Sequence, residues 1–333
     1  MLKTCLVALR QRPAFLLRCR FAHIAGGFAV SILVASTPAT VQAQLERAQP
    51  SASPKEAGAT EQFVLGSRPF AASSSWNSRI PAGAIFIPLN WPVSTGYNYG
   101  VTWSQYSPSI YTSSEADPIV TVAYPPGWGY KGGELKIRMP LEANGAAGTD
   151  GELIVIDGAT IHNFWQFKRA DPTSATAKSY GAANALTGTG WGSKRPALAA
   201  GIVAAGASQL AGLLVQAETD RGEIEHALQL CVDAKLVKHG FTGEAMSGDG
   251  KSPDGILQIG ERLAIAPGNA MQPALSPLGE KVLRALQNYG AFVIDVSGGS
   301  TNLRAQANAY DPETMAMLQR DLQRLIPMLQ RIR

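Results

Sequence analysis

The chain has 333 residues, of which 45% are hydrophobic and 16% are charged, enough apolar material for one large domain or two ordinary ones. Its formal charge of +4 is misleading, because residues 1–43 hold five basic residues and no acidic one, and the remainder carries 24 basic against 25 acidic residues. Nucleic-acid binding needs a concentrated basic surface, so no nucleic-acid partner is expected.

The N-terminal region has the pattern of an export signal. The apolar stretch Ile24–Ser36 follows basic residues and is too short to span a bilayer comfortably. Val41-Gln42-Ala43 matches the small-x-small pattern of a cleavage site. We expect residues 1–43 to be a signal peptide, and a buried core helix or a membrane anchor is the alternative. The mature protein is then exported, periplasmic or extracellular, with no stable membrane insertion after cleavage.

Three segments are expected after the signal. Residues 44–62 are rich in Ala, Ser, Pro and charge and predict a disordered linker. Residues 63–310 predict a single globular domain, and residues 311–333 a C-terminal amphipathic helix. Cys5 and Cys19 leave with the signal, so the mature chain retains only Cys231, whose apolar flanks predict a buried, inert thiol.

Short apolar runs separated by turn residues predict successive strands through about Arg169. The clearest are Glu152–Ile156 and Thr160–Phe167, because Asp157-Gly158 between two β-prone runs favours a hairpin. Both faces of Leu153–Ile156 are apolar, which predicts a strand buried on both sides.

The second half of the chain mixes ambiguous and firm signals. Pro196–Ala217 fits either a helix or a glycine-rich packed loop, and Glu223–Val237 fits a strand better than a helix. Ser276-Pro277 and Asp311-Pro312 each predict a helix start, and a strand is expected at Ala291–Val296. With 34 glycines and 21 prolines, these elements predict a β-rich fold, a sandwich or jelly-roll-like domain with a few packed helices. An α+β fold is the second choice.

The aromatic residues are unevenly distributed. All six tryptophans lie between residues 76 and 191. Their broad apolar faces and polar edges suit stacking on sugar rings, and the alternative is that they fill the core. The residues proposed to bind a polysaccharide are Trp165, Gln166, Trp76, Asn77 and Trp191.

Several titratable residues are candidates for acid–base chemistry. His226 shares the face of a predicted strand with apolar neighbours, and the alternative is a hydrogen-bonded core histidine. Asp157 is explained by its turn, and Asp150 in Gly-Thr-Asp-Gly has the same alternative, whereas Asp295 has no local structural reason. Tyr289 is a further candidate base. No metal or cofactor motif is recognised: Asp249–Asp254 lacks EF-hand spacing, and no phosphate loop or dinucleotide fingerprint is found.

Six motifs carry a family resemblance. They are Pro69-Phe70, Ser75–Pro81, Gly148–Gly151, Phe164–Gln166, Gly222–Leu228 and Ala285–Gly290. With them, the chain resembles a group of uncharacterised secreted bacterial proteins over most of residues 66–300. Relatives tend to carry histidine where this chain has Glu152, so a role of that histidine cannot be transferred. The resemblance implies an extracytoplasmic domain and no particular activity.

Export, aromatic density and the absence of cofactor motifs lead to a working hypothesis: a secreted carbohydrate-active enzyme acting on an extracellular or envelope polysaccharide. It would be a hydrolase, which needs two carboxylates, or a lyase, in which His226 or Tyr289 removes a proton next to a uronate carboxylate. Its catalytic residues would be His226, Asp150, Asp295 and Tyr289. The alternative is a non-catalytic polysaccharide-binding or cell-envelope structural protein of unknown oligomeric state. A third possibility is an assembly or secretion partner that docks through its amphipathic C-terminal helix. The enzyme hypothesis requires Trp165 and His226 to meet at one accessible groove.

Overall fold

The computed structural model describes residues 61–268 and 274–333. The predicted signal peptide and all but the last two residues of the predicted linker lie outside these ranges. The described residues form nineteen strands and three helices, so the prediction of a β-rich fold with a few packed helices is confirmed.

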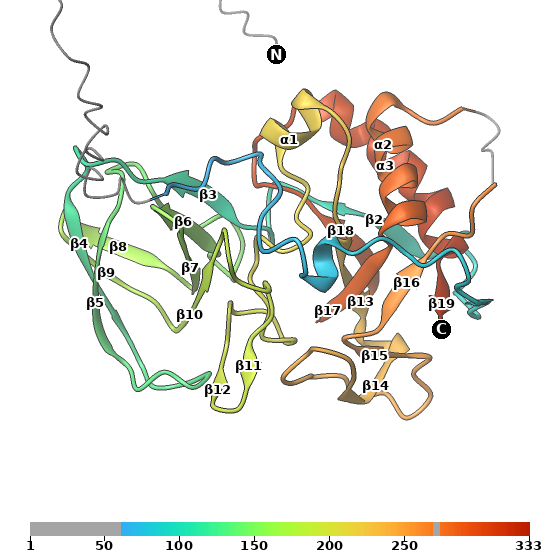
Figure 1. Cartoon of the computed structure of the whole chain (residues 1–333), viewed down its shortest axis with the longest axis horizontal. Coiled ribbons are helices and arrows are strands. Elements are labelled where there is room, and N and C mark those ends of the chain that lie inside the picture. Colours follow the sequence, from blue (N-terminus) through green and yellow to red (C-terminus); the bar gives the residue numbers. More distant parts are fainter. Residues whose placement is uncertain (1–60, 269–273) are drawn as a thin grey trace, which may run out of the picture. The chain divides into compact units, whose positions relative to one another are not determined.

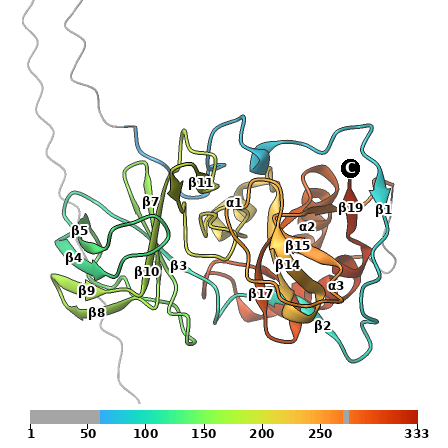
Figure 2. The same ribbon diagram turned by 90° about the horizontal axis from the view of Figure 1, so that it is seen from below.

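Two four-stranded sheets are formed by residues 109–184 (Figure 2). The first has the order β5-β4-β9-β8 and consists of β4 (Ile119–Tyr124), β5 (Gly133–Arg138), β8 (Lys168–Asp171) and β9 (Ser174–Thr176). The second has the order β10-β7-β6-β3 and consists of β3 (Ser109–Thr112), β6 (Leu153–Asp157), β7 (Thr160–Trp165) and β10 (Ser179–Asn184). Both sheets contribute side chains to one core, which includes Val120 and Val122 of β4 and Leu153 and Val155 of β6. This shared core is the arrangement of a sandwich.

Strand β6 separates two hydrophobic cores. Leu153 and Val155 belong to the core between the two four-stranded sheets, whereas Ile154 and Ile156 belong to the main core of the protein. The prediction of a strand buried on both faces is therefore confirmed. The predicted hairpin is also present, since β6 and β7 pair antiparallel from Asp157 opposite Thr160.

The main core surrounds a seven-stranded mixed sheet of order β1-β19-β16-β17-β13-β18-β2. Its strands are β1 (Phe86–Ile87), β2 (Asn98–Thr102), β13 (Leu228–Asp233), β16 (Arg262–Ala264), β17 (Ala291–Ser297), β18 (Ser300–Arg304) and β19 (Gln330–Ile332). Strand β17 pairs parallel with β13, and a bulge interrupts this ladder after Leu230. Two small ladders complete the strands: β11 (Ser193–Lys194) with β12 (Ala197–Leu198), and β14 (Val237–Phe241) with β15 (Leu257–Ile259).

Helices α2 (Pro277–Asn288) and α3 (Pro312–Leu325) begin at the predicted residues and lie side by side (Figure 1). Ser276 caps α2 by accepting from the Gly279 N–H, and Asp311 caps α3 by accepting from the Thr314 N–H. Together with α1 (Gln216–Arg221) they are the helices of the described residues. None of these helices has the length and apolar content needed to cross a membrane.

The C-terminal region differs from its prediction. Helix α3 ends at Leu325, and Gln330–Ile332 then enter the seven-stranded sheet between β1 and β16. Its apolar residues Met315, Leu318 and Leu322 are buried within the fold. The apolar stripe therefore packs inside the fold and is not an exposed surface through which this helix could dock.

Two ambiguous segments are now resolved. Residues 199–215 are an irregular packed loop, with small and apolar side chains buried in the main core. The preference for a strand within Glu223–Val237 is confirmed for Leu228–Asp233 only, because residues 223–227 form a loop that precedes β13.

Candidate functional site

A cavity of about 590 Å³ is lined by elements that are distant in the sequence. Its walls come from the β4–β5 connection, the turn before β6, the end of β7, the start of β10, the packed loop 199–215, the loop after β14, and β17. The chemically important lining residues are Trp128, Asp150, Glu152, Trp165, Lys178, Asp249 and Asp295. A cavity of this size is in the range of small-molecule and sugar sites.

Asp295 lies on β17 at the wall of this cavity. Its carboxylate accepts hydrogen bonds from the backbone N–H groups of Ala204 (3.2 Å) and Val296 (2.9 Å). Burial of the carboxyl group, followed by the negative charge of Asp249, raises the pKa of Asp295 to about 8. At neutral pH this side chain therefore holds a proton.

Asp249 is the partner of Asp295. It belongs to the loop after β14, reaches solvent, and forms a side-chain hydrogen bond with Asp295. Partial burial of its carboxyl group raises the pKa of Asp249 as well. Two carboxyl groups this close share one proton, because both cannot ionise without repulsion. We call these two residues the acid pair.

Asp150 is held at the cavity wall by the end of β7. The Trp165 indole N–H donates to the Asp150 carboxylate (3.2 Å), and the Gln166 backbone N–H donates to the Asp150 carbonyl (2.7 Å). Gly148 and Gly151 flank Asp150 with φ angles of +97° and +46°, which a side chain disfavours. The Gly-Thr-Asp-Gly turn and the end of β7 therefore fix the carboxylate and the indole relative to one another.

A buried ion pair stands behind Asp150. Glu152 at the cavity wall pairs with Arg304 of β18, and both side chains are buried. Burial lowers the pKa of Arg304 to about 10, and the charge of Asp150 acts in the opposite direction. Because Arg304 neutralises it, Glu152 adds little net charge to the cavity.

Cys231 is half-buried on β13 and pairs in register with Asp295. Burial and the charge of Asp295 raise the pKa of the Cys231 thiol well above its usual value. A protonated thiol is a poor nucleophile, which agrees with the expectation of an inert side chain.

His226 lies elsewhere and does not line the cavity with Trp165, so the enzyme hypothesis that required both at one groove fails in that form, and any catalytic proposal has to rest on other residues. It is 2% exposed, its Nε2 lies 2.9 Å from a Glu218 carboxylate oxygen, and its Nδ1 lies 2.9 Å from the Ala227 carbonyl oxygen. The space beside it is only about 10 Å³. Burial disfavours the imidazolium, but the charge and hydrogen bond of Glu218 outweigh burial and raise the pKa of His226. Its surroundings are those of a structural histidine.

The residues Trp76, Trp191 and Asn77, which were predicted to contact sugar, also lie away from the cavity. Trp76 and Trp191 stack in the main core with ring centroids 4.9 Å apart, and Phe292 packs against both. The Asn77 side-chain amide donates to backbone carbonyl groups in the Pro69–Ala71 segment. These side chains are buried and do not line the cavity, so their assignment as sugar contacts is corrected to core packing.

Tyr289 and Gln166 also lie outside the cavity lining. The Tyr289 ring is 3% exposed and lies under the Arg79 guanidinium, 5.1 Å from the ring centroid. Gln166 is partly exposed next to Trp165, and its φ of +50° belongs to the turn that presents Asp150. Tyr289 is therefore not positioned to remove a proton from a substrate in this cavity, and Gln166, predicted to bind substrate, is not among the residues that line it.

Besides Glu152, three of the lining residues named above were not predicted as site residues. Asp249 was considered only as part of a metal loop, whose spacing it lacks. Trp128 carried a usable signal, because a tryptophan between Gly127 and Gly129 in a loop is difficult to bury; its φ of +56° confirms the unusual turn. Lys178 gave no signal, since an exposed lysine at the start of a strand has no distinguishing pattern.

The comparisons with known proteins add no family. No family model, no curated protein and no solved structure matches the chain. Over the described ranges, no group of three or more His, Cys, Asp or Glu side chains is arranged to hold a metal ion.

Proposed function

We propose that the protein is an exported glycoside hydrolase that cleaves a polysaccharide in the cavity described above. The observation that carries the proposal is a protonated acid pair, Asp295 and Asp249, that opens onto the same cavity as the carboxylate of Asp150 and the side chain of Trp165. Glycoside hydrolysis requires this combination of a carboxylic acid and a carboxylate beside one sugar.

The two carboxyl sites would take different roles. The acid pair protonates the glycosidic oxygen as the bond between that oxygen and the anomeric carbon breaks. The Asp150 carboxylate stabilises the positive charge that develops on the sugar ring, and Trp165 and Trp128 supply apolar faces for the sugar. Water then adds its hydroxyl group to the anomeric carbon. The remaining proton of that water passes to the protein and restores the proton that the acid pair gave up. The anomer released first identifies whether Asp150 activates this water or bonds transiently to the sugar.

The hydrolase is preferred over the lyase considered above. A lyase requires a base beside the proton next to a uronate carboxylate, and the two candidate bases, His226 and Tyr289, do not line the cavity. The cavity instead supplies a proton donor, which hydrolysis needs in its first step.

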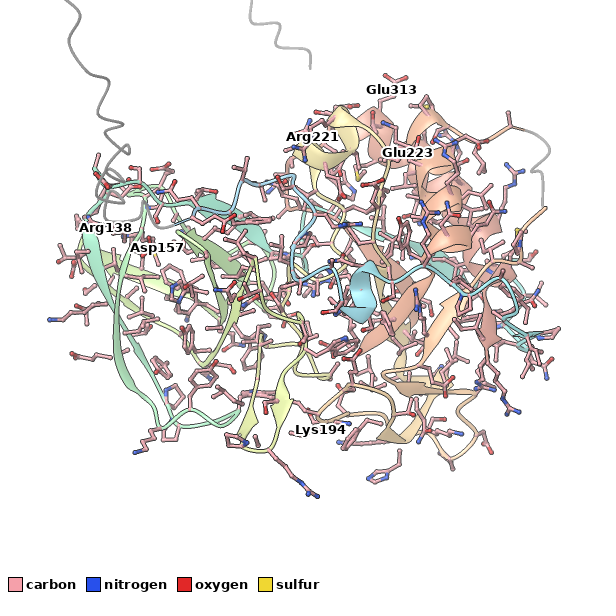
Figure 3. The ribbon with its side chains drawn as sticks, viewed as in Figure 1. Arg138, Asp157, Lys194, Arg221, Glu223 and Glu313 are labelled. Carbon is pink, nitrogen blue, oxygen red and sulfur yellow. The ribbon has the colours of Figure 1, made fainter. Side chains whose placement is uncertain are left out.

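The decisive test is turnover by the purified protein on a panel of polysaccharides, measured as new reducing ends. We expect Asp295→Asn and Asp150→Asn each to lower kcat/KM by roughly 10²–10⁴-fold, the range typical of acid–base catalysis. Asp157→Asn is the matched control. Asp157 (Figure 3) is the last residue of β6, the strand that begins just after Asp150, and its carboxylate accepts from the Ser113 hydroxyl. We expect its turnover to stay within about twofold of wild type.

The pH profile tests the acid pair separately. Activity should fall as pH rises past about 8, where Asp295 loses its proton. Asp249→Asn removes the charge that helps to raise the pKa of Asp295, so this alkaline limb should move to lower pH. A wild-type protein that binds glycans and releases no product from any of them would instead establish the non-catalytic binding role.

A further inference from the structure

The charges around the cavity restrict the kind of sugar that it accepts. Four carboxyl groups line it, those of Asp150, Glu152, Asp249 and Asp295, and among the described lining residues Lys178 is the one cation. Lys178 is exposed. Two further cations act nearby: Arg304, which is already paired with Glu152, and Lys251, whose charge opposes the rise in the pKa of Asp249. An anionic sugar would therefore bring its charge toward carboxyl groups, and no arginine is among the described residues that line the cavity.

Asp150 and Trp165 form the most specific part of this wall. One carboxylate oxygen of Asp150 accepts from the Trp165 indole N–H, which fixes the orientation of the carboxylate. A carboxylate whose orientation is fixed in this way suits an ammonium group, because its other oxygen can accept a charge-assisted hydrogen bond from the ammonium.

A second observation indicates a polar ligand in the same cavity. The Ser179 hydroxyl is buried and has no hydrogen-bond partner among the described residues, and Ser179 lines the cavity. A buried polar atom of this kind is normally satisfied, and a rotation of the Ser179 side chain toward the cavity that it lines would bring its hydroxyl to a hydroxyl or amino group of a bound sugar.

We infer that the polysaccharide substrate contains a hexosamine with a free amino group, and that Asp150 and Trp165 recognise its ammonium. This inference rests on the proposed hydrolase function and narrows it to cationic amino-sugar polymers. Acetylated hexosamine lacks the charge that Asp150 would pair with, and uronate carries the opposite charge.

The experiment compares matched ligands on a protein that binds without cleaving. Asp295→Asn is titrated calorimetrically with glucosamine oligosaccharides and galactosamine oligosaccharides, each as the free amine and after chemical N-acetylation, and with oligogalacturonate. We expect at least one free amine to bind about tenfold or more tightly than its acetylated counterpart, and oligogalacturonate to bind weakest. The preference should be lost when Asp150→Asn is added to this variant.

Lys178→Gln provides a control with the opposite sign. Removing a positive charge at the cavity should strengthen binding of the free amines severalfold and leave the acetylated oligosaccharides unchanged. Equal or tighter binding of acetylated sugars or of uronate would overturn the inference, even if the wild-type protein cleaves those glycans. Absence of cleavage on every glycan would reject the hydrolase, whereas the binding preference is measured independently of turnover.

Discussion

Two acidic sites in this protein show what separates a structural from a functional arrangement. At the first, Glu218 faces His226, the two side chains meet at 2.9 Å, and the space beside His226 is about 10 Å³. At the second, Asp295 faces another acid, Asp249, and both line a cavity of about 590 Å³. The first site is a satisfied pair in a closed core. The second holds two carboxyl groups together next to solvent, where only one of them can ionise, which costs stability and is typical of catalytic sites.

The largest effect on stability is expected at the closed site. His226→Ala leaves the buried Glu218 carboxylate without its partner, which should lower the free energy of unfolding by about 3–5 kcal/mol. Denaturant unfolding near pH 6 measures this change. Turnover per folded molecule should be unaffected; lost turnover at unchanged stability would instead make His226 catalytic and reverse the comparison.

The free energy of unfolding should depend on pH through Asp295, and the Asp295→Asn variant should lack this dependence. The folded pKa of Asp295, about 8, lies above the ordinary value, so the folded protein binds a proton that the unfolded chain releases above about pH 4. This contribution to stability is fully present below about pH 4 and is lost as pH rises toward 8. Between pH 4.5 and 6 the wild type should lose up to about 1.4 kcal/mol per pH unit relative to Asp295→Asn.

Between pH 4.5 and 6, the stabilising contribution of Asp295 changes with pH and that of His226 does not. The raised pKa of His226 makes its stabilising contribution fall only above about pH 6.5, where the unfolded histidine deprotonates first. Parallel pH profiles for wild type and Asp295→Asn between pH 4.5 and 6 would contradict the raised pKa.

The smallest effect is expected at the indole beside Asp150. Trp165→Phe keeps an aromatic ring but removes the N–H that donates to the Asp150 carboxylate. Loss of one hydrogen bond of about 0.5–1.5 kcal/mol predicts a reduction of roughly two- to tenfold in kcat/KM. Trp76→Phe is the contrasting change, because Trp76 packs between Trp191 and Phe292 in the core. It should lower the melting temperature and leave kcat/KM unchanged.

Part of the candidate site was accessible from the sequence because its residues lack local explanations. Asp295 has no turn or cap to account for it, and the Gly-Thr-Asp-Gly turn before a buried strand identified Asp150. Both line the cavity with Trp165, which was also predicted. His226 was misplaced because alternating apolar residues extended the predicted strand back to Ile224, whereas the strand begins at Leu228. Trp76 and Trp191 show that aromatic composition does not distinguish a sugar platform from a core.

By itself, the sequence determined the features that depend on neighbours along the chain: the Ser276 and Asp311 helix caps, the Asp157-Gly158 turn and the doubly buried strand β6. These signals are local because capping, turn geometry and side-chain alternation act over a few residues. Only the tertiary structure decided that Asp249 meets Asp295, that Glu152 pairs with Arg304, and that His226 is closed off by Glu218. Such pairings depend on which strands are adjacent and on which face of each strand points toward the cavity, and no short stretch of sequence contains that information.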